Sequence, residues 1–154
     1  MKHVQKSVLL WYSPHEIYAL VTDVERYPQF LPWCTAVDVL GRDGETLTAR
    51  LHLAYSGIRH AFTTTNRQVP DTSVQIGLVD GPFSVLDGLW RFVGLRVPGG
   101  DEAAAPAACR IEFELRYAFA NGLLEAAISP VFDRIADTFV DAFVARAEAV
   151  YGAR

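Results

Sequence analysis

Residues 129–147, SPVFDRIADTFVDAFVARA, carry apolar side chains three or four positions apart. This spacing places them on one face of a helix. The pattern continues beyond the stretch and predicts an amphipathic helix of roughly 30 residues from Asn121 onward. Its apolar face consists of Leu124, Ile128, Val131, Phe132, Ile135, Phe139, Phe143 and Val150. Such a broad aromatic face must be buried, so the rest of the chain has to supply a complementary apolar surface.

The sequence before this helix predicts seven short strands, separated by turns rich in Gly, Pro, Asn and Asp. The last strand has the clearest alternation, with Ile111, Phe113 and Leu115 on one face and charged residues on the other. Turns are expected at 41–44 and after residue 54, and a loop is expected at 98–106. The predicted strands cover residues 4–11, 37–40, 46–54, 58–68, 74–78, 86–95 and 110–117.

A short helix is expected between the first two strands. It begins at Ser13–Pro14, where Ser13 is the N-cap and Glu16 completes a capping box. It should end by Tyr27, because Pro28 disfavours helical geometry at the preceding residue. A second short turn is expected to stop at Pro32.

Consecutive strands joined by short turns indicate an antiparallel sheet. We therefore expect one α+β domain over residues 1–154, in which a curved seven-stranded antiparallel sheet wraps around the long C-terminal helix. A curved sheet and a single helix rarely fill the space between them completely. This arrangement favours a cavity between sheet and helix that is suited to an apolar ligand.

The composition excludes several classes of protein. The net charge of −4 argues against direct DNA binding, which needs clustered Lys and Arg. No apolar run approaches the ~18 residues of a membrane span, and the first residues do not have the pattern of a signal peptide. Cys34 and Cys109 lie far apart without metal-ligand spacing, as expected for reduced thiols. We expect a cytoplasmic protein.

The sequence contains no recognisable catalytic motif and no set of metal ligands. We expect a turn that places Leu53 opposite Ile58, which puts His52 and His60 on opposite faces of the sheet. Two separated histidines are too few for a zinc site, so we predict no metal, no cofactor and no catalytic residue. If the cavity nevertheless held an enzyme site, the residues to test would be Tyr55, His60, Asn66 and Arg67.

Four blocks of the sequence, in order along the chain, resemble one known family. They are DVERYPQFLPWC at 23–34, FTT at 62–64, GPF at 81–83 with LDGLWRF at 86–92, and the helical stretch at 129–147. The family belongs to the START-like lipid-binding superfamily, whose members have the helix-grip fold. It joins the mitochondrial coenzyme Q-binding proteins with the bacterial ribosome association toxins, formerly described as oligoketide cyclase or lipid transport proteins.

The resemblance implies a carrier or chaperone of a polyprenyl quinone such as ubiquinone, which supports respiration. For some bacterial members it implies a toxin that binds the large ribosomal subunit and blocks subunit joining. Many relatives carry basic residues directly after GPF, whereas Ser84 and Val85 follow here. We therefore expect quinone or lipid binding, with transient contact at the inner membrane as an option. The alternatives are ribosome association and a polyketide cyclase-like activity.

The predicted ligand-contacting residues are large apolar side chains from the four blocks, the strands and the helix. They are Tyr27, Phe30, Leu31, Trp33, Phe62, Phe83, Trp90, Phe92, Phe113, Phe132, Ile135 and Phe139. Those at 27–33 lie in a proline-broken segment, where they act as a plug of the core, as a rim of the cavity, or as both. Phe83 follows a Gly-Pro turn and is expected to fold over the cavity mouth as a gate.

Overall fold

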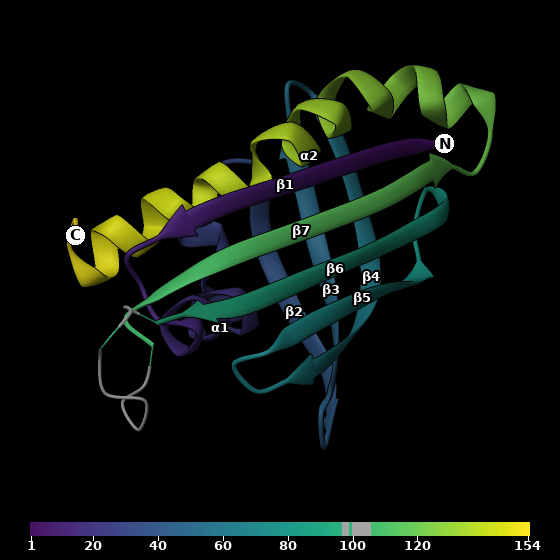
Figure 1. Ribbon diagram of the computed structural model, residues 1–154. Coiled ribbons are helices and arrows are strands. Elements are labelled where there is room, and N and C mark those ends of the chain that lie inside the picture. Colours follow the sequence, from purple (N-terminus) through teal and green to yellow (C-terminus); the bar gives the residue numbers. More distant parts are fainter. Residues whose placement is uncertain (97–98, 100–105) are drawn as a thin grey trace.

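The structure is a seven-stranded antiparallel sheet with one long helix on one face (Figure 1). This computed structural model describes residues 1–96, 99 and 106–154. Of the loop predicted at 98–106, residues 98 and 100–105 lie outside that range. The elements are β1 (Lys2–Leu10), α1 (Pro14–Thr22), the 3-10 helix η1 (Val24–Gln29), β2 (Cys34–Asp43), β3 (Thr46–Tyr55), β4 (Ile58–Val69), β5 (Ser73–Asp80), β6 (Phe83–Leu95), β7 (Ala108–Phe119) and α2 (Gly122–Tyr151). The predicted fold class is confirmed.

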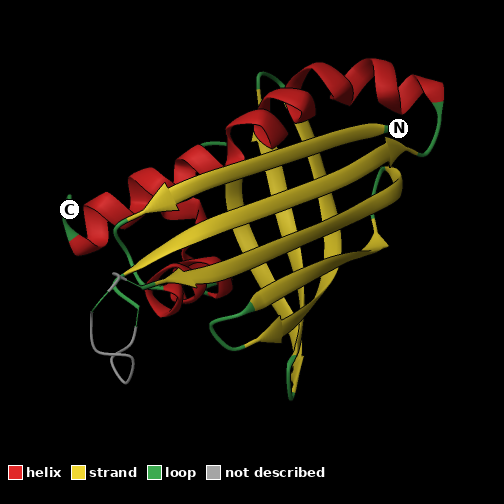
Figure 2. Cartoon of the chain, in the orientation of Figure 1, coloured by secondary structure: helices red, strands yellow, loops and turns green. Residues whose placement is uncertain are grey.

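The strand order is β1-β7-β6-β5-β4-β3-β2, so β1 and β2 form the two edges of the sheet. The segment with α1 and η1 carries the chain from one edge to the other. Figures 1 and 2 show α2 running alongside β1 and β7, while the sheet curls so that β2, β3 and β4 run across that direction. This curl gives the sheet a concave face, and α2 covers it.

The predicted capping box at the start of α1 is present. The Ser13 hydroxyl accepts a hydrogen bond from the Glu16 backbone N–H at 3.1 Å, and the Glu16 carboxylate accepts one from the Ser13 N–H at 3.0 Å. The helix ends before Tyr27, as expected. Its last residue is Thr22, and the chain continues as the 3-10 helix η1, which contains Pro28.

The long helix α2 spans 30 residues, as predicted. Its first turn is capped by Asn121, whose side-chain Oδ1 accepts a hydrogen bond from the Leu124 N–H at 2.9 Å. Although α2 is long, no helix in the described part of the chain is apolar enough over a sufficient length to cross a membrane.

The turn between β2 and β3 lies later than predicted. Strand β2 continues through Asp43, and the turn is Gly44–Glu45 instead of residues 41–44. Gly44 has a φ of 58°, a left-handed conformation that glycine adopts without strain. Gly44, the last residue of the predicted turn, is therefore the first residue of the observed turn.

The register between β3 and β4 also differs from the prediction. Tyr55, not Leu53, lies opposite Ile58, because Ser56–Gly57 form a two-residue turn with φ values of 50° and 80°. Such a turn matches the twist of the strands and lets pairing continue up to the turn. Because the error is two residues, every side chain keeps its predicted face.

Aromatic rings join α2 to the sheet over most of its length. The Trp90 side chain is fully buried, and its ring centroid lies 5.7 Å from that of Phe139 and 5.2 Å from that of Phe143. Nearer the start of α2, the Phe132 ring lies 4.8 Å from that of Tyr117 on β7. The predicted apolar stripe of the helix therefore faces the predicted apolar side of β6 and β7.

We expect Phe143→Ala to lower the free energy of unfolding by about 3–5 kcal/mol, because it removes a buried ring that contacts four other aromatic rings. Leu123→Ala on the same helix is the control, since Leu123 is 81% exposed and its loss should change stability by less than about 0.5 kcal/mol. Urea unfolding of both variants measures the difference. Equal effects would contradict the packing described above.

Candidate functional site

A cavity of about 70 Å3 lies between the concave face of the sheet and α2. Strands β3 to β7, the η1 region and α2 all contribute to its wall. Every lining residue is buried except Ile76 and Phe139, which are half-buried. The lining consists of Val24, Tyr27, Trp33, Leu51, Phe62, Thr64, Asn66, Ile76, Leu86, Phe113, Leu115, Phe132, Ile135, Ala136 and Phe139.

The structure divides the twelve predicted contact residues into two groups. Those that line the cavity are Tyr27, Trp33, Phe62, Phe113, Phe132, Ile135 and Phe139. Those that pack elsewhere are Phe30, Leu31, Phe83, Trp90 and Phe92. The sequence predicts the inward face correctly, but residues on one face share the same pattern whether they border the cavity or the solid core. Ligand contact by the first group stays a prediction.

Sequence reasoning missed other lining residues. Leu51, Leu86 and Leu115 lie on the inward face of their strands, and strand alternation was the signal that could have found them. Ala136 is a small residue on the predicted helix face. Asn66 had been considered only as a residue to test for catalysis.

The proline-broken segment that follows α1 acts as a plug and also borders the cavity. The Tyr27 hydroxyl donates a hydrogen bond to the Val21 carbonyl, and burial raises the pKa of this phenol well above its ordinary range. The Phe30 ring packs on Phe143 with 5.1 Å between centroids. The Trp33 ring stacks on Phe62 with 6.3 Å between centroids. Tyr27 and Trp33 therefore combine the two roles that the sequence left open.

Phe83 is not at an exposed turn tip. It is the first residue of β6, it is 5% exposed, and its ring lies 4.8 Å from that of Phe132 on α2. The preceding turn explains this placement, because Gly81 passes so close to β4 that an added Cβ would lie 2.7 Å from the Phe62 Cβ. The turn thus brings Phe83 directly into the core, where it closes one end of the aromatic cluster.

Two polar side chains, Thr64 and Asn66, line the cavity from β4. Asn66 is 8% exposed, and its side-chain oxygen has no hydrogen-bond partner within the described residues. A buried polar atom without a partner lowers stability by roughly 1–3 kcal/mol. The lining contains no carboxylate, imidazole or guanidinium group in the part of the chain that the structure describes.

The residues that could carry other chemistry lie outside the cavity. His52 and His60 are on opposite faces of the sheet, as predicted, and the exposed His52 ring lies 2.7 Å from the Asp38 carboxylate. Across residues 1–96, 99 and 106–154, no group of three potential metal ligands comes together. Cys34 and Cys109 are buried, and burial raises the pKa of each thiol to about 11, so neither is a thiolate at neutral pH.

A polar cluster fixes the part of α2 that covers the cavity. The Asp133 carboxylate accepts hydrogen bonds from the Lys2 ammonium at 2.8 Å and the Ser129 hydroxyl at 3.1 Å, and a third from the Tyr117 hydroxyl. Lys2 and Tyr117 belong to β1 and β7, so this one carboxylate ties α2 to two strands. Burial alone would raise the pKa of Asp133, but the three hydrogen bonds outweigh it and leave the pKa below its ordinary value.

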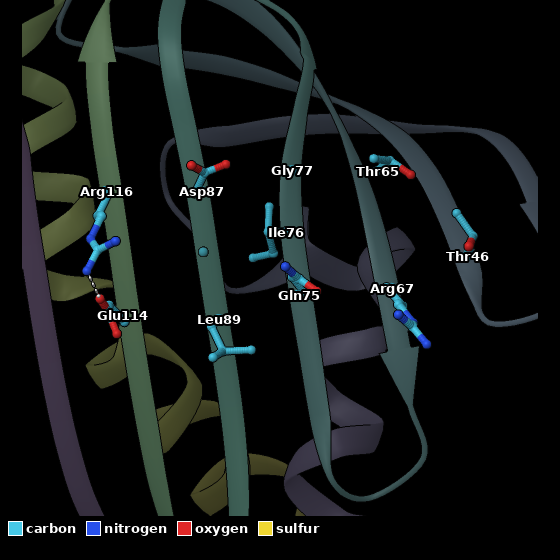
Figure 3. A pocket seen from close by; sticks show the side chains of 11 residues that line it. Thr46, Thr65, Arg67, Gln75, Ile76, Gly77, Asp87, Leu89, Glu114 and Arg116 are labelled. Atoms are coloured by element: carbon cyan, nitrogen blue, oxygen red, sulfur yellow. Dashed lines mark ion pairs between the residues drawn. The ribbon is translucent and has the colours of Figure 1, made fainter.

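A larger hollow of about 730 Å3 lies on the outer face of the sheet (Figure 3). Its wall carries charges of both signs, including Arg67, Asp87 and an ion pair of 2.9 Å between Arg116 and Glu114. Gly77 forms part of its floor. This hollow is wide and polar, so it offers an apolar ligand little surface, and the smaller inner cavity is the better candidate site.

Comparison with known sequences gives a consistent picture. Residues 10–144 match the family described as polyketide cyclase / dehydrase and lipid transport. The ribosome association toxin RatA of Pseudomonas aeruginosa is 39% identical over 150 residues, which cover 97% of this chain and 98% of that protein. RatA of Escherichia coli K12 is 40% identical over 154 residues, which cover 100% of this chain and 92% of that protein. The mitochondrial coenzyme Q-binding protein COQ10 homolog B of Xenopus laevis is 28% identical, over 96% of this chain and 58% of that protein.

Solved structures resemble the whole chain. An 18 kDa protein of Caulobacter crescentus is 32% identical with a TM-score of 0.70, over 99% of this chain and 100% of that one. A START superfamily protein of Mycobacterium smegmatis has a TM-score of 0.76 at 19% identity. The match covers 96% of this chain and 98% of that one. The Zhui aromatase/cyclase of Streptomyces sp. R1128 has a TM-score of 0.76 at 15% identity, over 96% and 93%. The last two likenesses show the fold alone.

The Asp133 cluster predicts a specific acid sensitivity. Since its carboxyl has a lower pKa when folded than when unfolded, its stabilising effect is fully present above about pH 4 and is lost as the pH falls through the folded pKa. We expect Asp133→Asn to be less stable than the unsubstituted protein at pH 7 and to lose less stability on acidification. Urea unfolding at several pH values between about 7 and 3 measures this. Parallel stability curves would contradict the assignment.

Proposed function

The chain belongs to the polyketide cyclase / dehydrase and lipid transport family, and on that premise we propose that it binds a hydrophobic small molecule between the sheet and α2. The proposed ligand is a polyprenyl quinone such as ubiquinone, or a lipid of similar build, and the proposed role is to carry or present it. The observation that carries this proposal is the buried, mainly apolar lining of the inner cavity.

The chemistry of the lining fits such a ligand. Burial of apolar surface contributes about 25 cal/mol per Å2, so a long hydrocarbon tail gains affinity without specific contacts. A polar head needs one or two hydrogen-bonding groups, and β4 supplies Thr64 and Asn66. The 28% identity with a coenzyme Q-binding protein adds support for a quinone over other lipids.

Ligand binding requires side chains to move. A cavity of roughly 150 Å3 is known to admit benzene, whereas this one has a volume of about 70 Å3. Phe139 is half-buried and its centroid lies 6.4 Å from that of Trp33, so rotation of these two rings is the most direct way to enlarge the space. A polyprenyl tail is longer than the domain interior and extends out of it, which suits transient contact with a membrane surface.

The proposed role is binding, without catalysis. An enzyme of the cyclase type needs an acid, a base or an oxyanion donor directed at the substrate. The residues considered for that purpose, Tyr55, His60 and Arg67, do not line the cavity, and the described lining supplies no group that titrates near neutral pH. We place this activity in the cytoplasm, with exchange of the ligand at the inner membrane.

Ala136→Leu tests the site. Ala136 lines the cavity and is 1% exposed, so the added side-chain volume occupies the space a ligand needs. We expect this variant to bind a short-chain ubiquinone at least about tenfold more weakly than the unsubstituted protein. Quenching of tryptophan fluorescence follows binding, since Trp33 borders the cavity.

The matched control is Ala126→Leu, the same substitution on the exposed face of the same helix, which should bind normally. Extraction of the purified protein followed by mass spectrometry identifies any co-purified quinone or lipid. Absence of both co-purified lipid and binding to added quinone would refute the proposal. Equal binding by Ala136→Leu and Ala126→Leu would place any bound ligand elsewhere.

A second candidate function is association with the ribosome. It is favoured by the 39% and 40% identity, over nearly the full length, with proteins named ribosome association toxin. Arg50 on β3 and Arg59 on β4 are exposed on the outer face of the sheet and make no ion pair within the described residues. Unpaired arginines are the side chains best suited to contact RNA phosphates.

Overexpression followed by sucrose-gradient sedimentation tests this second candidate. If the protein blocks subunit joining, free subunits should increase at the expense of joined ribosomes, and the protein should sediment with the large subunit. The double variant Arg50→Glu, Arg59→Glu should weaken that effect, whereas Ala126→Leu should not. A normal profile with the protein only at the top of the gradient would remove this candidate.

A further inference from the structure

Asn66 interrupts a row of apolar residues that runs across the concave face of the sheet. Cross-strand pairing places six residues side by side in this row: Val4, Leu115, Gly88, Ile76, Asn66 and Leu47. Arg42 continues the row at the exposed edge strand β2, so Asn66 is its single buried polar member. Its neighbours on either side, Leu47 and Ile76, are apolar, so nothing in the row pairs with its carboxamide.

The same face of β4 carries two more polar side chains. Thr64 precedes Asn66 by two positions and also lines the cavity. Gln68 follows by two positions, and its side-chain nitrogen is buried and has no hydrogen-bond partner within the described residues. Gln68 does not line the cavity, so the polar lining from β4 consists of Thr64 and Asn66, while α2 lines the cavity with Phe132, Ile135, Ala136 and Phe139.

A purely structural role does not account for Asn66. Buried polar groups that stabilise a fold are almost always paired within the protein. Tyr27 is an example in this chain, since its buried hydroxyl donates a hydrogen bond to the Val21 carbonyl. Asn66 Oδ1 has no hydrogen-bond partner within the described residues, although the side chain is only 8% exposed. Local rules of burial are usually broken where a site is needed for binding.

We infer that Asn66 is the head-group contact of the cavity and that the preferred ligand carries a hydroxyl donor on its ring, as a phenol or hydroquinone does. This inference rests on the proposed function. A ligand hydroxyl can donate a hydrogen bond to the unpaired Asn66 Oδ1. A quinone carbonyl or an ether oxygen only accepts, so it can pair with the Asn66 amide nitrogen but leaves Oδ1 without a partner. Among redox forms of one quinone, the site therefore favours the reduced form.

Two uncharged probes that differ in this single donor test the inference: 4-octylphenol and its methyl ether, 4-octylanisole. Isothermal titration of the unsubstituted protein should show about five- to tenfold tighter binding of the phenol, as expected for one buried hydrogen bond. Asn66→Leu should lose this preference and bind the two probes about equally. It should also unfold at a higher urea concentration, because it removes an unpaired buried polar group.

Thr65→Val is the matched control, since Thr65 lies on the opposite face of β4, at the outer hollow, and should leave the preference intact. Equal affinity of the unsubstituted protein for phenol and ether overturns the inference but leaves the proposed function standing. The same holds if Asn66→Leu keeps the preference, or if it unfolds at a lower urea concentration. Binding of neither probe overturns this inference, whereas the proposed function is refuted only by the absence of both co-purified lipid and binding to added ubiquinone. The comparison of the two probes needs no variant, so it does not depend on the folding of Asn66→Leu.

Discussion

The packing of aromatic rings from α2 against the concave face of the sheet is the interaction on which the rest of the structure depends. A curled sheet with an apolar inner face cannot remain exposed to water, and α2 alone covers most of it. Trp90 is fully buried between β7 and the helix, with ring centroids 4.6 Å from Phe113 and 5.7 Å from Phe139. Large, flat, rigid rings cannot fill a curved space completely. The cavity is a consequence of the way in which the fold is stabilised.

The position of the cavity follows from the same geometry. Where α2 runs alongside β7, its rings meet those of Tyr117 and Phe113 directly. Where β2, β3 and β4 run across the direction of the helix (Figure 1), Trp33 in the segment after η1 packs between Phe62 on β4 and Phe139 on α2. The wall there is a set of rings in mutual contact, which can rotate more readily than backbone can move. This is the part of the molecule where a ligand can enlarge the space at least energetic cost.

The sequence predicts the faces of the elements well and the depth of each residue poorly. Alternation in β7 and the three-to-four spacing in α2 identify the inward sides, because burial of one face imposes that period. The same period cannot separate Trp90, which packs in solid core, from Phe113, which borders the cavity. The error in the β3–β4 register has a similar origin. An apolar face constrains a strand pair only to within two residues, and the Ser56–Gly57 turn decides between the possibilities.

Asn66 bears on the relation between the two candidate functions. Association with a ribosome engages the outer surface, and a side chain that is 8% exposed on the inner face of the sheet contributes nothing to such a contact. A chain selected only for an outer binding surface would gain stability from an apolar residue at position 66, since its cross-strand neighbours Leu47 and Ile76 are apolar. The unpaired carboxamide is what the proposed ligand inside the domain would pair with. The two proposals therefore concern different parts of the molecule: ligand binding would use the interior, and ribosome association would use the outer face of the sheet.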